Sequence, residues 1–359
     1  MAGTRGLARL TPVDLLRFAI VGFGNVGAAL ARHVHERSER VGRRYGIDLR
    51  LVAVADSTGF LNDTAGLDGN ELAAWRESGR RLAERSGAHR HCQLEDVLAA
   101  GVDVVVISLP TDRDTGKPGL NVARASIAAG AHVVLADKGP ALLALPELER
   151  EAALRGVTVG ASATVGAALP TLSVARRELA GAELLEIEAI LNGTSNLILT
   201  SMRERGISFH EAVAEAQRAG IAEPDPSYDV QGWDTAVKLT ILTRALIDER
   251  ATLNLVGRTG IDELEPDFVK WAHRTGGRIR LIGRAVRRNG GAVVTVAPEV
   301  VPPHNPFHLV DGARKAIRFV TDDLGELVVT GGASGRRDVA AALLRDMLAT
   351  KCQSGVWKG

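Results

Sequence analysis

Only two cysteines, Cys92 and Cys352, occur among the 359 residues, and neither belongs to a CxxC pair or a Cys/His cluster. A disulfide framework and a structural zinc site are therefore not expected, and the composition suits a reducing compartment. No apolar run reaches the ~18 residues of a transmembrane helix, and the N-terminal segment lacks the apolar core of a secretory signal. We therefore expect a cytoplasmic protein.

An excess of charge of one sign is also missing. The 44 Lys and Arg residues nearly balance the 43 Asp and Glu residues, so the formal net charge is +1 at pH 7. Such a chain has no strong field to attract nucleic acid or a membrane surface. The basic stretches at 32–44 and 76–90 are interleaved with Glu and Gly, which favours solvated helix faces over phosphate tracks. We expect a small-molecule partner and no nucleic-acid or membrane partner.

The first part of the chain contains four short apolar segments separated by stretches of helical composition. Near-continuous apolar runs of this kind are typical of parallel strands that are covered on both faces. The sequence therefore predicts an α/β fold with a Rossmann-type parallel-sheet domain over residues 1–155. The expected strands are 17–21, 49–55, 102–109 and 132–135, with a helix at 28–40 after the first.

The pattern changes beyond residue 155, where apolar and acidic residues alternate as in a strand with one solvated face. An Asn-Gly-Gly turn joins two later segments as an antiparallel pair. We predict an α+β second domain over 156–318, and a C-terminal strand and helix over 319–359 that return to the nucleotide-binding domain. The expected strands are 184–190, 279–285, 292–297 and 327–330, and the expected helices are 196–205, 208–219, 230–248 and a final helix through about 349.

A glycine-rich turn, Gly22-Phe23-Gly24-Asn25-Val26-Gly27, lies between the first predicted strand and its helix. In dinucleotide-binding folds the first Gly permits the tight turn, the second lets the backbone approach a pyrophosphate, and the third allows close helix packing. The helix N-terminus also favours phosphates. A plain strand–helix turn is the alternative, but the position of the motif favours a nicotinamide dinucleotide site formed by these residues.

Asp56 directly follows the second predicted strand, where an acidic side chain can accept hydrogen bonds from an adenosine ribose. The residues after it, Ser57, Thr58 and Gly59, include no Arg that would receive a 2′-phosphate. This favours NAD over NADP. The alternative for Asp56 is an ordinary turn-capping aspartate.

The densest polar segment runs from Glu223 through Asp229 and Asp234 to Lys238. Asp234 and Lys238 are four residues apart, so they share a helix face, and Ile241 continues that face. An i,i+4 surface ion pair is the ordinary interpretation. So many carboxylates near one lysine favour instead an inward-facing site, with an ammonium-bearing amino-acid substrate as the partner of the acids.

A second lysine, Lys138, follows the fourth predicted strand. The carboxyl ends of the strands of an open parallel sheet form the edge where ligands bind. Lys138 can therefore hold a polarised carbonyl, a carboxylate or the nicotinamide there. The alternative is a surface cation in a turn.

Several segments together resemble the homoserine dehydrogenase family, and the resemblance covers essentially the whole chain. The segment from 223 to 242, joined to the Asn-Gly-Thr-Ser-Asn run, is the most specific part. The matching segments are GFGNVG (22–27), ADKGP (136–140), ATVGAALP (163–170), LNGTSNLIL (191–199), EPDPSYDVQGWDTAVKLTIL (223–242) and GGASGRRDVAAALLRDML (331–348).

The resemblance implies an NAD(P)-dependent enzyme that interconverts L-aspartate 4-semialdehyde and L-homoserine, in threonine and methionine biosynthesis. It implies a second domain that binds substrate and forms a homodimer. Lys238 matches the family's catalytic lysine, and Asp234 matches the acid that supports proton transfer. The other implied positions are Glu223, Asp229, Thr194 and Gly193 for the substrate, Lys138 for both cofactor and substrate, and Gly335 in the C-terminal glycine turn for the cofactor.

The sequence departs from the family at three places. Asp137 stands where the family usually has Asn, and Ala161-Ser162 replace a Tyr-Glu pair. In family members the backbone of the following loop is associated with a sodium ion. The resemblance therefore implies a sodium site at the backbone of Val165, Ala167 and Leu169, although the Glu of the family is missing here. A C-terminal regulatory ACT domain is not expected, since the sequence stops soon after the final predicted helix.

Two alternatives to a homoserine dehydrogenase remain at the level of sequence. One is a related enzyme that acts on a different small amino-aldehyde or hydroxy amino acid, which the changes at Asp137 and Ala161-Ser162 would allow. The other is a non-catalytic dinucleotide sensor. The retained lysines and acids argue against a sensor, because a sensor needs no proton-transfer group.

Overall fold

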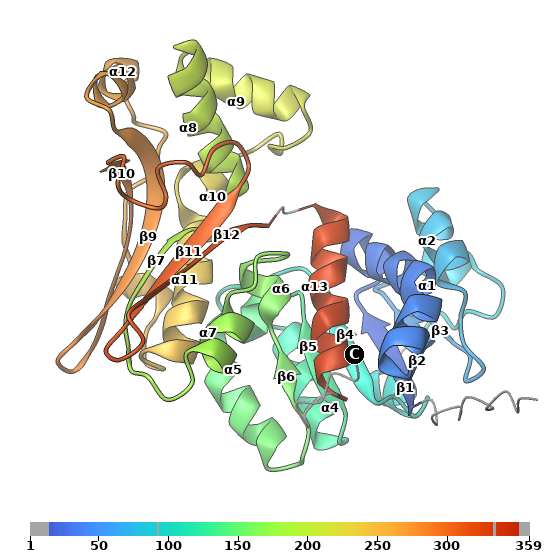
Figure 1. Cartoon of the computed structure of the whole chain (residues 1–359). Helices are drawn as coiled ribbons and strands as arrows, with labels where there is room; N and C mark the ends of the chain where they lie inside the picture. The colour runs from blue at the N-terminus through green and yellow to red at the C-terminus, as the bar shows by residue number, and fades with distance from the viewer. Residues whose placement is uncertain (1–13, 92, 333–334, 352–359) are drawn as a thin grey trace, which may run out of the picture.

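The computed structural model describes residues 14–91, 93–332 and 335–351, so both cysteines lie outside the described residues. The chain forms two six-stranded sheets, with helices packed around and between them (Figure 1). The α/β fold class predicted from the sequence is confirmed. Within the described residues, no helix is both long and apolar enough to cross a membrane.

The first sheet has the strand order β3-β2-β1-β4-β5-β6, and every neighbouring pair is parallel except β2 and β3. Strand order reverses between β1 and β4, which is the switch point where such sheets bind ligands. The strands are β1 (Asp14–Val21), β2 (Ile47–Ala55), β3 (Phe60–Asn62), β4 (Val104–Ile107), β5 (His132–Leu135) and β6 (Val159–Gly160).

Helices cover this sheet because its strands are apolar on both sides. α1 ends at Tyr45, because the next residue, Gly46, has a left-handed φ of 67° that stops the helix. The helices of this half are α1 (Asn25–Tyr45), α2 (Gly69–Glu77), the 3₁₀ turn η1 (Leu82–Glu84), α3 (Leu94–Leu98), α4 (Gly119–Ala128), α5 (Lys138–Ala153), α6 (Ser162–Val165) and α7 (Leu172–Glu178).

The second sheet has the order β12-β11-β7-β9-β10-β8 and is antiparallel except for the short β8–β10 pair. Its strands are β7 (Leu184–Ile190), β8 (Gly257–Arg258), β9 (Arg278–Arg288), β10 (Gly291–Val301), β11 (Lys315–Thr321) and β12 (Glu326–Gly331). Its helices are α8 (Gly193–Arg205), α9 (Phe209–Arg218), α10 (Ser227–Val230), α11 (Trp233–Leu246), η2 (Leu253–Leu255) and α12 (Pro266–Arg274).

The helix predicted over 230–248 begins three residues too early, since α11 begins at Trp233. Gly232 has a φ of 81°, and this left-handed residue separates the short α10 from α11. Asp234 and Lys238 therefore both belong to α11, which begins one residue before Asp234. Ile241 is fully buried, so the face that these residues share does point inward.

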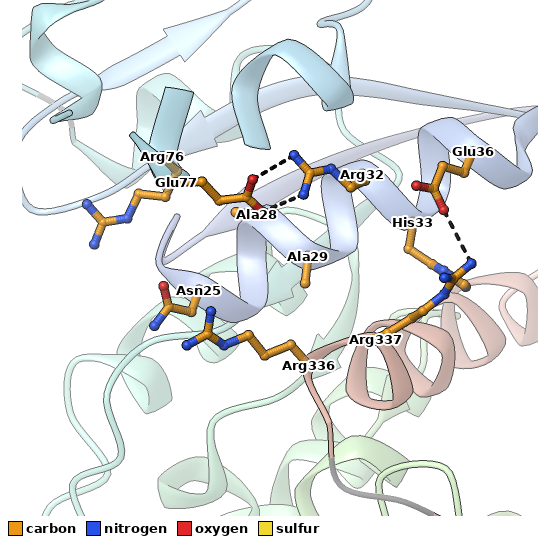
Figure 2. Close-up of a pocket in the computed structure, with 10 residues that line it drawn as sticks. All are labelled: Asn25, Ala28, Ala29, Arg32, His33, Glu36, Arg76, Glu77, Arg336 and Arg337. Atoms are coloured by element: carbon orange, nitrogen blue, oxygen red, sulfur yellow. Dashed lines mark hydrogen bonds and ion pairs between the residues drawn. The ribbon is translucent and has the colours of Figure 1, made fainter. Parts of the chain in front are cut away.

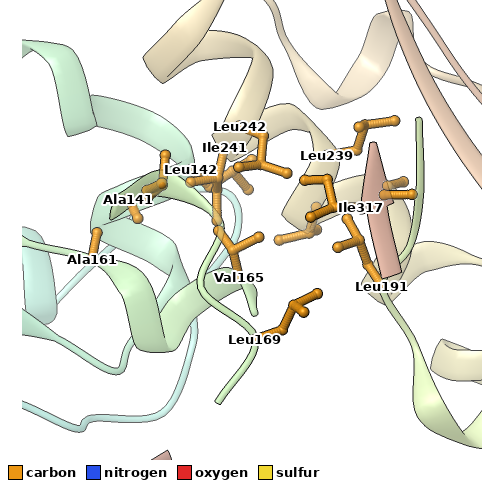
Figure 3. Close-up of a cluster of buried hydrophobic side chains, with 14 of the residues drawn as sticks. Ala141, Leu142, Ala161, Val165, Leu169, Leu191, Leu239, Ile241, Leu242 and Ile317 are labelled. Atoms are coloured by element: carbon orange, nitrogen blue, oxygen red, sulfur yellow. The ribbon is translucent and has the colours of Figure 1, made fainter. Parts of the chain in front are cut away.

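Each sheet with its helices forms one half of the protein, and the two halves share a continuous apolar core. Side chains of α5, of the loop after β6, of α11 and of β11 pack together in one cluster (Figure 3). The C-terminal segment lies across both halves, because β12 pairs with β11 in the second sheet whereas α13 (Arg336–Ala349) packs on α1. In the described part of the 319–359 segment, β12 thus belongs to the second sheet and α13 lies against the nucleotide-binding half.

Candidate active site

The glycine-rich turn leaves β1 and enters α1 with the geometry that a phosphate-binding turn needs. Gly22 has a φ of 96°, and a Cβ there would lie 2.6 Å from the carbonyl carbon and oxygen of Ser108. A Cβ at Gly24 would instead meet no atom within 4 Å. The backbone of Gly24 is therefore open to close approach by a ligand, as a pyrophosphate requires. The turn fits a dinucleotide.

Asp56 performs the turn-capping role that its sequence position allowed. Its Oδ1 accepts hydrogen bonds from the backbone N–H of Thr58 at 2.7 Å and of Gly59 at 3.1 Å. Asp56 also lines a mainly apolar hollow of about 270 Å³ beside Gly22. The hollow lies at the carboxyl ends of β1 and β2, where an adenosine would bind in folds of this type.

A second pocket lies at the other side of the turn, where α1, α2 and the N-terminal end of α13 meet (Figure 2). Asn25, the first residue of α1, lies beside Arg336 of α13 (Figure 2). The pocket is rich in arginine, although Arg32 and Arg337 are engaged by glutamates of α2 and α1. Gly335 lies at the same end of α13 and donates its N–H to Asp338 at 3.0 Å. Positive charge thus borders the proposed phosphate position.

Lys238 is buried at the junction of the two halves. Its Nζ donates to the Asp234 Oδ2 at 2.5 Å and to the Leu191 carbonyl at 2.9 Å. The other oxygen of Asp234 lies 3.1 Å from the Nζ of Lys138, which begins α5. Only 5% of Asp234 and 9% of Lys238 are exposed, so this is not an ordinary surface ion pair. One carboxylate therefore holds two lysines that come from different halves of the protein.

The two lysines set the charge state of Asp234. Burial alone would raise the pKa of this carboxyl, but the nearby ammonium groups of Lys238 and Lys138 outweigh burial and hold the pKa well below its usual range. The negative charge of Asp234 in turn raises the pKa of Lys138. Lys138 is therefore protonated at neutral pH, and Asp234 is ionised.

Asn192 completes this cluster, and the sequence analysis did not single it out. Its side-chain amide donates to Asp229 at 2.7 Å and to Asp234 at 2.8 Å, while its oxygen caps α8 by accepting from the Ser195 N–H at 2.8 Å. Asp229 also receives a hydrogen bond from Thr194, and burial raises the pKa of Asp229. The signal that could have found Asn192 is its place directly before the Gly-Thr-Ser start of a helix.

The remaining predicted substrate residues lie at different distances from the cluster. Gly193 begins α8 next to Asn192, and a Cβ there would lie 2.8 Å from the Ala313 carbonyl oxygen. Glu223 is exposed and makes none of the hydrogen bonds or ion pairs of the lysine–carboxylate cluster.

Arg113 was not predicted from the sequence, yet it lies beside the cluster's Lys138. The Arg113 guanidinium lies 4.9 Å from the centre of the Tyr228 ring, and the Lys138 Nζ lies 5.9 Å from it.

Asp137 is a buried carboxyl whose two oxygens differ in their hydrogen bonding. Its Oδ1 accepts from the Gly139 N–H at 2.9 Å, whereas its Oδ2 is a buried atom without a hydrogen-bond partner in the described structure. Burial raises the pKa of Asp137 to about 6. At neutral pH Asp137 is therefore mostly ionised, although its burial disfavours the negative charge.

We expect Asp137→Asn to stabilise the protein at neutral pH. An amide keeps the cap on α5 and removes the charge, and the shift from 3.8 to about 6 corresponds to at most about 3 kcal/mol. Because the folded-state pKa is raised, the gain should be absent below the unfolded pKa and reach its maximum above about pH 6. Chemical denaturation at several pH values measures it, and a gain independent of pH would contradict the assignment.

The loop after β6 carries the three residues that the resemblance associates with sodium, Val165, Ala167 and Leu169. Ala167 has a left-handed φ of 52°, which is rare for a residue with a Cβ. The Nζ of Lys315, at the start of β11, donates to the carbonyl of Gly166 in this loop. Lys315 is fully buried, and burial lowers its pKa to about 7, with Lys238 acting in the same direction.

Comparison with known proteins agrees with this geometry. The family model described as homoserine dehydrogenase matches residues 170–348, and the Glutamate/Leucine/Phenylalanine/Valine dehydrogenase model matches residues 7–134. An NAD(+)-dependent homoserine dehydrogenase of Pseudomonas canavaninivorans is 35% identical over 335 residues, 92% of this chain and 95% of that protein.

Solved structures give the same result. A crystal structure from Archaeoglobus fulgidus, provisionally named a homoserine dehydrogenase, has a TM-score of 0.82 and 33% identity, covering 93% of this chain and 98% of that one. A hyperthermophilic archaeal homoserine dehydrogenase in complex with NADPH has a TM-score of 0.79 and 26% identity, covering 94% and 98%. With its lysine–carboxylate cluster beside a dinucleotide turn, this chain belongs to the homoserine dehydrogenase family.

Proposed function

We propose that Lys238 moves the proton to and from the substrate oxygen as L-aspartate 4-semialdehyde and L-homoserine are interconverted. The observation that carries the proposal is the buried Asp234 carboxylate, which holds both Lys238 and Lys138. Hydride transfer to an aldehyde builds negative charge on oxygen, and a fixed ammonium group stabilises and protonates that oxygen. Homoserine-dependent reduction of the dinucleotide tests the reaction.

Asp234 and its neighbours have positioning roles in this proposal. Asp234 and the Leu191 carbonyl both accept hydrogen bonds from the Nζ of Lys238, so together they limit the directions in which that Nζ can turn. Asp229, joined to Asp234 through Asn192, offers a carboxylate for the ammonium group of the substrate. We place Thr194 and Gly193 beside that ammonium group, and Glu223 at the exposed rim of the site.

A nicotinamide dinucleotide supplies the hydride acceptor or donor when it is bound. The residues that would hold it surround the glycine-rich turn and the carboxyl edge of the first sheet. The open backbone at Gly24 and the hollow beside Asp56 fit its pyrophosphate and adenosine parts. The proposed cofactor residues are Gly22, Gly24, Asn25, Val26, Gly27, Asp56, Lys138 and Gly335.

We propose NAD as the preferred cofactor, because the carboxylate of Asp56 lies in the hollow where a 2′-phosphate would have to approach it. Asp56→Ser should keep the hydrogen bond to the turn and remove the charge. We expect the NAD/NADP ratio of kcat/KM to fall roughly tenfold, about 1.4 kcal/mol. Steady-state rates with each dinucleotide measure it. A wild-type preference for NADP, or an unchanged ratio in the variant, would contradict the role of Asp56.

We also propose a homodimer formed through the second sheet, by analogy with the family. Side chains on the β7 face opposite α11 are linked by ion pairs, with Arg284 bridging Glu186 and Glu188 at 2.7 and 2.8 Å. These ion pairs tie β7 to β9 and keep the face ordered. Size-exclusion chromatography with light scattering should give twice the chain mass of 38.0 kDa. A single species at the chain mass would refute the dimer.

We further propose that the enzyme acts in the cytoplasm, in the branch of amino-acid biosynthesis that leads from aspartate to threonine and methionine. Growth of a homoserine-requiring bacterial strain on minimal medium, with this chain as its source of activity, tests the placement. Rescue should be lost in the same strain carrying a Lys238→Ala chain.

A further inference from the structure

The loop that connects β6 to α7 is held by a lysine from another part of the chain. Lys315 is the first residue of β11, 0% of it is exposed, and its Nζ donates to the carbonyl of Gly166. A buried lysine is rare unless its ammonium group has partners. The partner here is a backbone carbonyl, the kind of ligand that also binds alkali cations.

The loop is tightly folded around this contact. A Cβ at Gly166 would lie 2.0 Å from the Leu169 carbonyl oxygen, and Ala167 adopts a left-handed φ of 52°. On the other side, a Cβ at Gly332 would lie 2.6 Å from the backbone nitrogen of Leu169. The loop is therefore enclosed between β11, the segment after β12 and the core that joins the two halves.

The residues present do not fit the sodium ion that the family resemblance implies for this loop. Ser162 supplies no carboxylate, and its backbone N–H donates to Asp346 of α13 at 2.9 Å. The Nζ of Lys315 is already placed at the Gly166 carbonyl, between two of the residues expected to bind the ion. A metal cation at the same loop would have to displace this Nζ from the Gly166 carbonyl, and it would repel the ammonium form of the lysine at short range.

We propose that Lys315 takes the place of a metal cation at the 165–169 loop, so that the chain supplies its own positive group and needs no sodium. Lys315 also lies near enough to Lys238 and Asp234 for their charges to act on it. The lysine thus fixes the loop against β11 of the second sheet, near the helix α11 that carries Asp234 and Lys238. It is a positioning residue, since it reaches the cluster through charge and packing.

The test compares melting temperatures in sodium chloride and choline chloride at equal ionic strength and at pH 6, below the Lys315 pKa of about 7, so that Lys315 carries its charge. For the unmodified enzyme, we expect the two salts to give the same melting temperature at every concentration. Lys315→Met removes the positive group, and we expect sodium to raise its melting temperature by at least about 3 °C over choline, in a saturable manner. Lys270→Met, a change at an exposed lysine of α12, should behave like the unmodified enzyme.

Two outcomes would overturn the proposal. One is a saturable, sodium-specific gain in the unmodified enzyme, because the loop would then bind the metal despite Lys315. The other is a Lys315→Met variant that responds equally to sodium and choline, because the loop would then need no cation. If Lys315→Met does not fold, Lys315→Gln is measured in its place, with the same expectation.

This inference rests on the proposed function, since the sodium expectation comes from the family, but its readout does not need turnover. If the enzyme proves to act on another substrate while the melting temperatures behave as expected, the proposed reaction falls and the role of Lys315 stands. If homoserine is oxidised but sodium, unlike choline, raises the melting temperature of the unmodified enzyme, the proposed reaction stands and the role of Lys315 falls.

Discussion

Replacing Lys238 with alanine is expected to lower kcat for homoserine oxidation by about 10²–10⁴-fold, the contribution of a positioned proton-transfer group. The loss arises because Asp234 and the Leu191 carbonyl hold the Nζ of Lys238 in place, and alanine leaves no proton-transfer group at this position. The KM for the dinucleotide should change little, because the glycine-rich turn lies between β1 and α1, whereas Lys238 belongs to α11. Steady-state kinetics with the dinucleotide and homoserine varied separately measure both quantities.

The matched control is Lys270→Ala, because Lys270 is exposed on α12 and its ion pair with the exposed Asp267 is long, at 3.4 Å. Its kcat should equal that of the unmodified enzyme. Near-normal turnover in Lys238→Ala, with folding confirmed by circular dichroism, would make Lys238 a structural residue and remove the proposed mechanism.

The second large effect is expected from Asp234→Asn, which leaves two lysines without their shared negative charge. Breaking a buried ion pair on one side costs about 3–5 kcal/mol, so both the free energy of unfolding and kcat should fall. The pKa of Asp234 is lowered in the fold, so its contribution is present above the unfolded pKa of 3.8 and is lost in stronger acid. The stability difference between variant and enzyme should therefore be large at neutral pH and shrink below about pH 4.

Urea denaturation across pH measures this difference. Asp267→Asn is the matched control, since Asp267 is almost fully exposed and should leave stability and kcat unchanged. An Asp234→Asn variant as stable and active as the unmodified enzyme would mean that the carboxylate is needed neither for stability nor for catalysis. A stability loss that is equal at all pH values would mean that packing, and not charge, makes Asp234 important.

Much of the fold could be predicted because the strands of the first sheet are apolar on both faces. The segments predicted as strands at 132–135 and 184–190 coincide with β5 and β7. The break at Gly232 was missed, because a glycine inside a helical pattern is compatible with both a continuous helix and a left-handed stop. The choice depends on the neighbouring strand, whose Val296 lies 3.1 Å from the position of a Cβ at Gly232.

Strand β11 was not predicted, and the reason lies in Lys315. A lysine at the start of a segment reads as polar and exposed, whereas here it is buried against a carbonyl of another loop. The meeting of Asp234 with Lys138 could likewise not be derived from spacing, because they are 96 residues apart and meet only when the halves pack. Lys238 and Asp234 could be predicted, since helical periodicity alone places them on one face.

The most direct test of the proposed reaction is the initial rate of NAD reduction by the purified enzyme with L-homoserine, followed through the absorbance of the reduced nicotinamide. The same assay is run with a panel of β- and γ-hydroxy amino acids and with the Lys238→Ala variant. We expect a homoserine-dependent rate that exceeds every other rate in the panel and is lost in the variant. A folded protein that binds the dinucleotide but oxidises another hydroxy amino acid faster than homoserine would contradict the account.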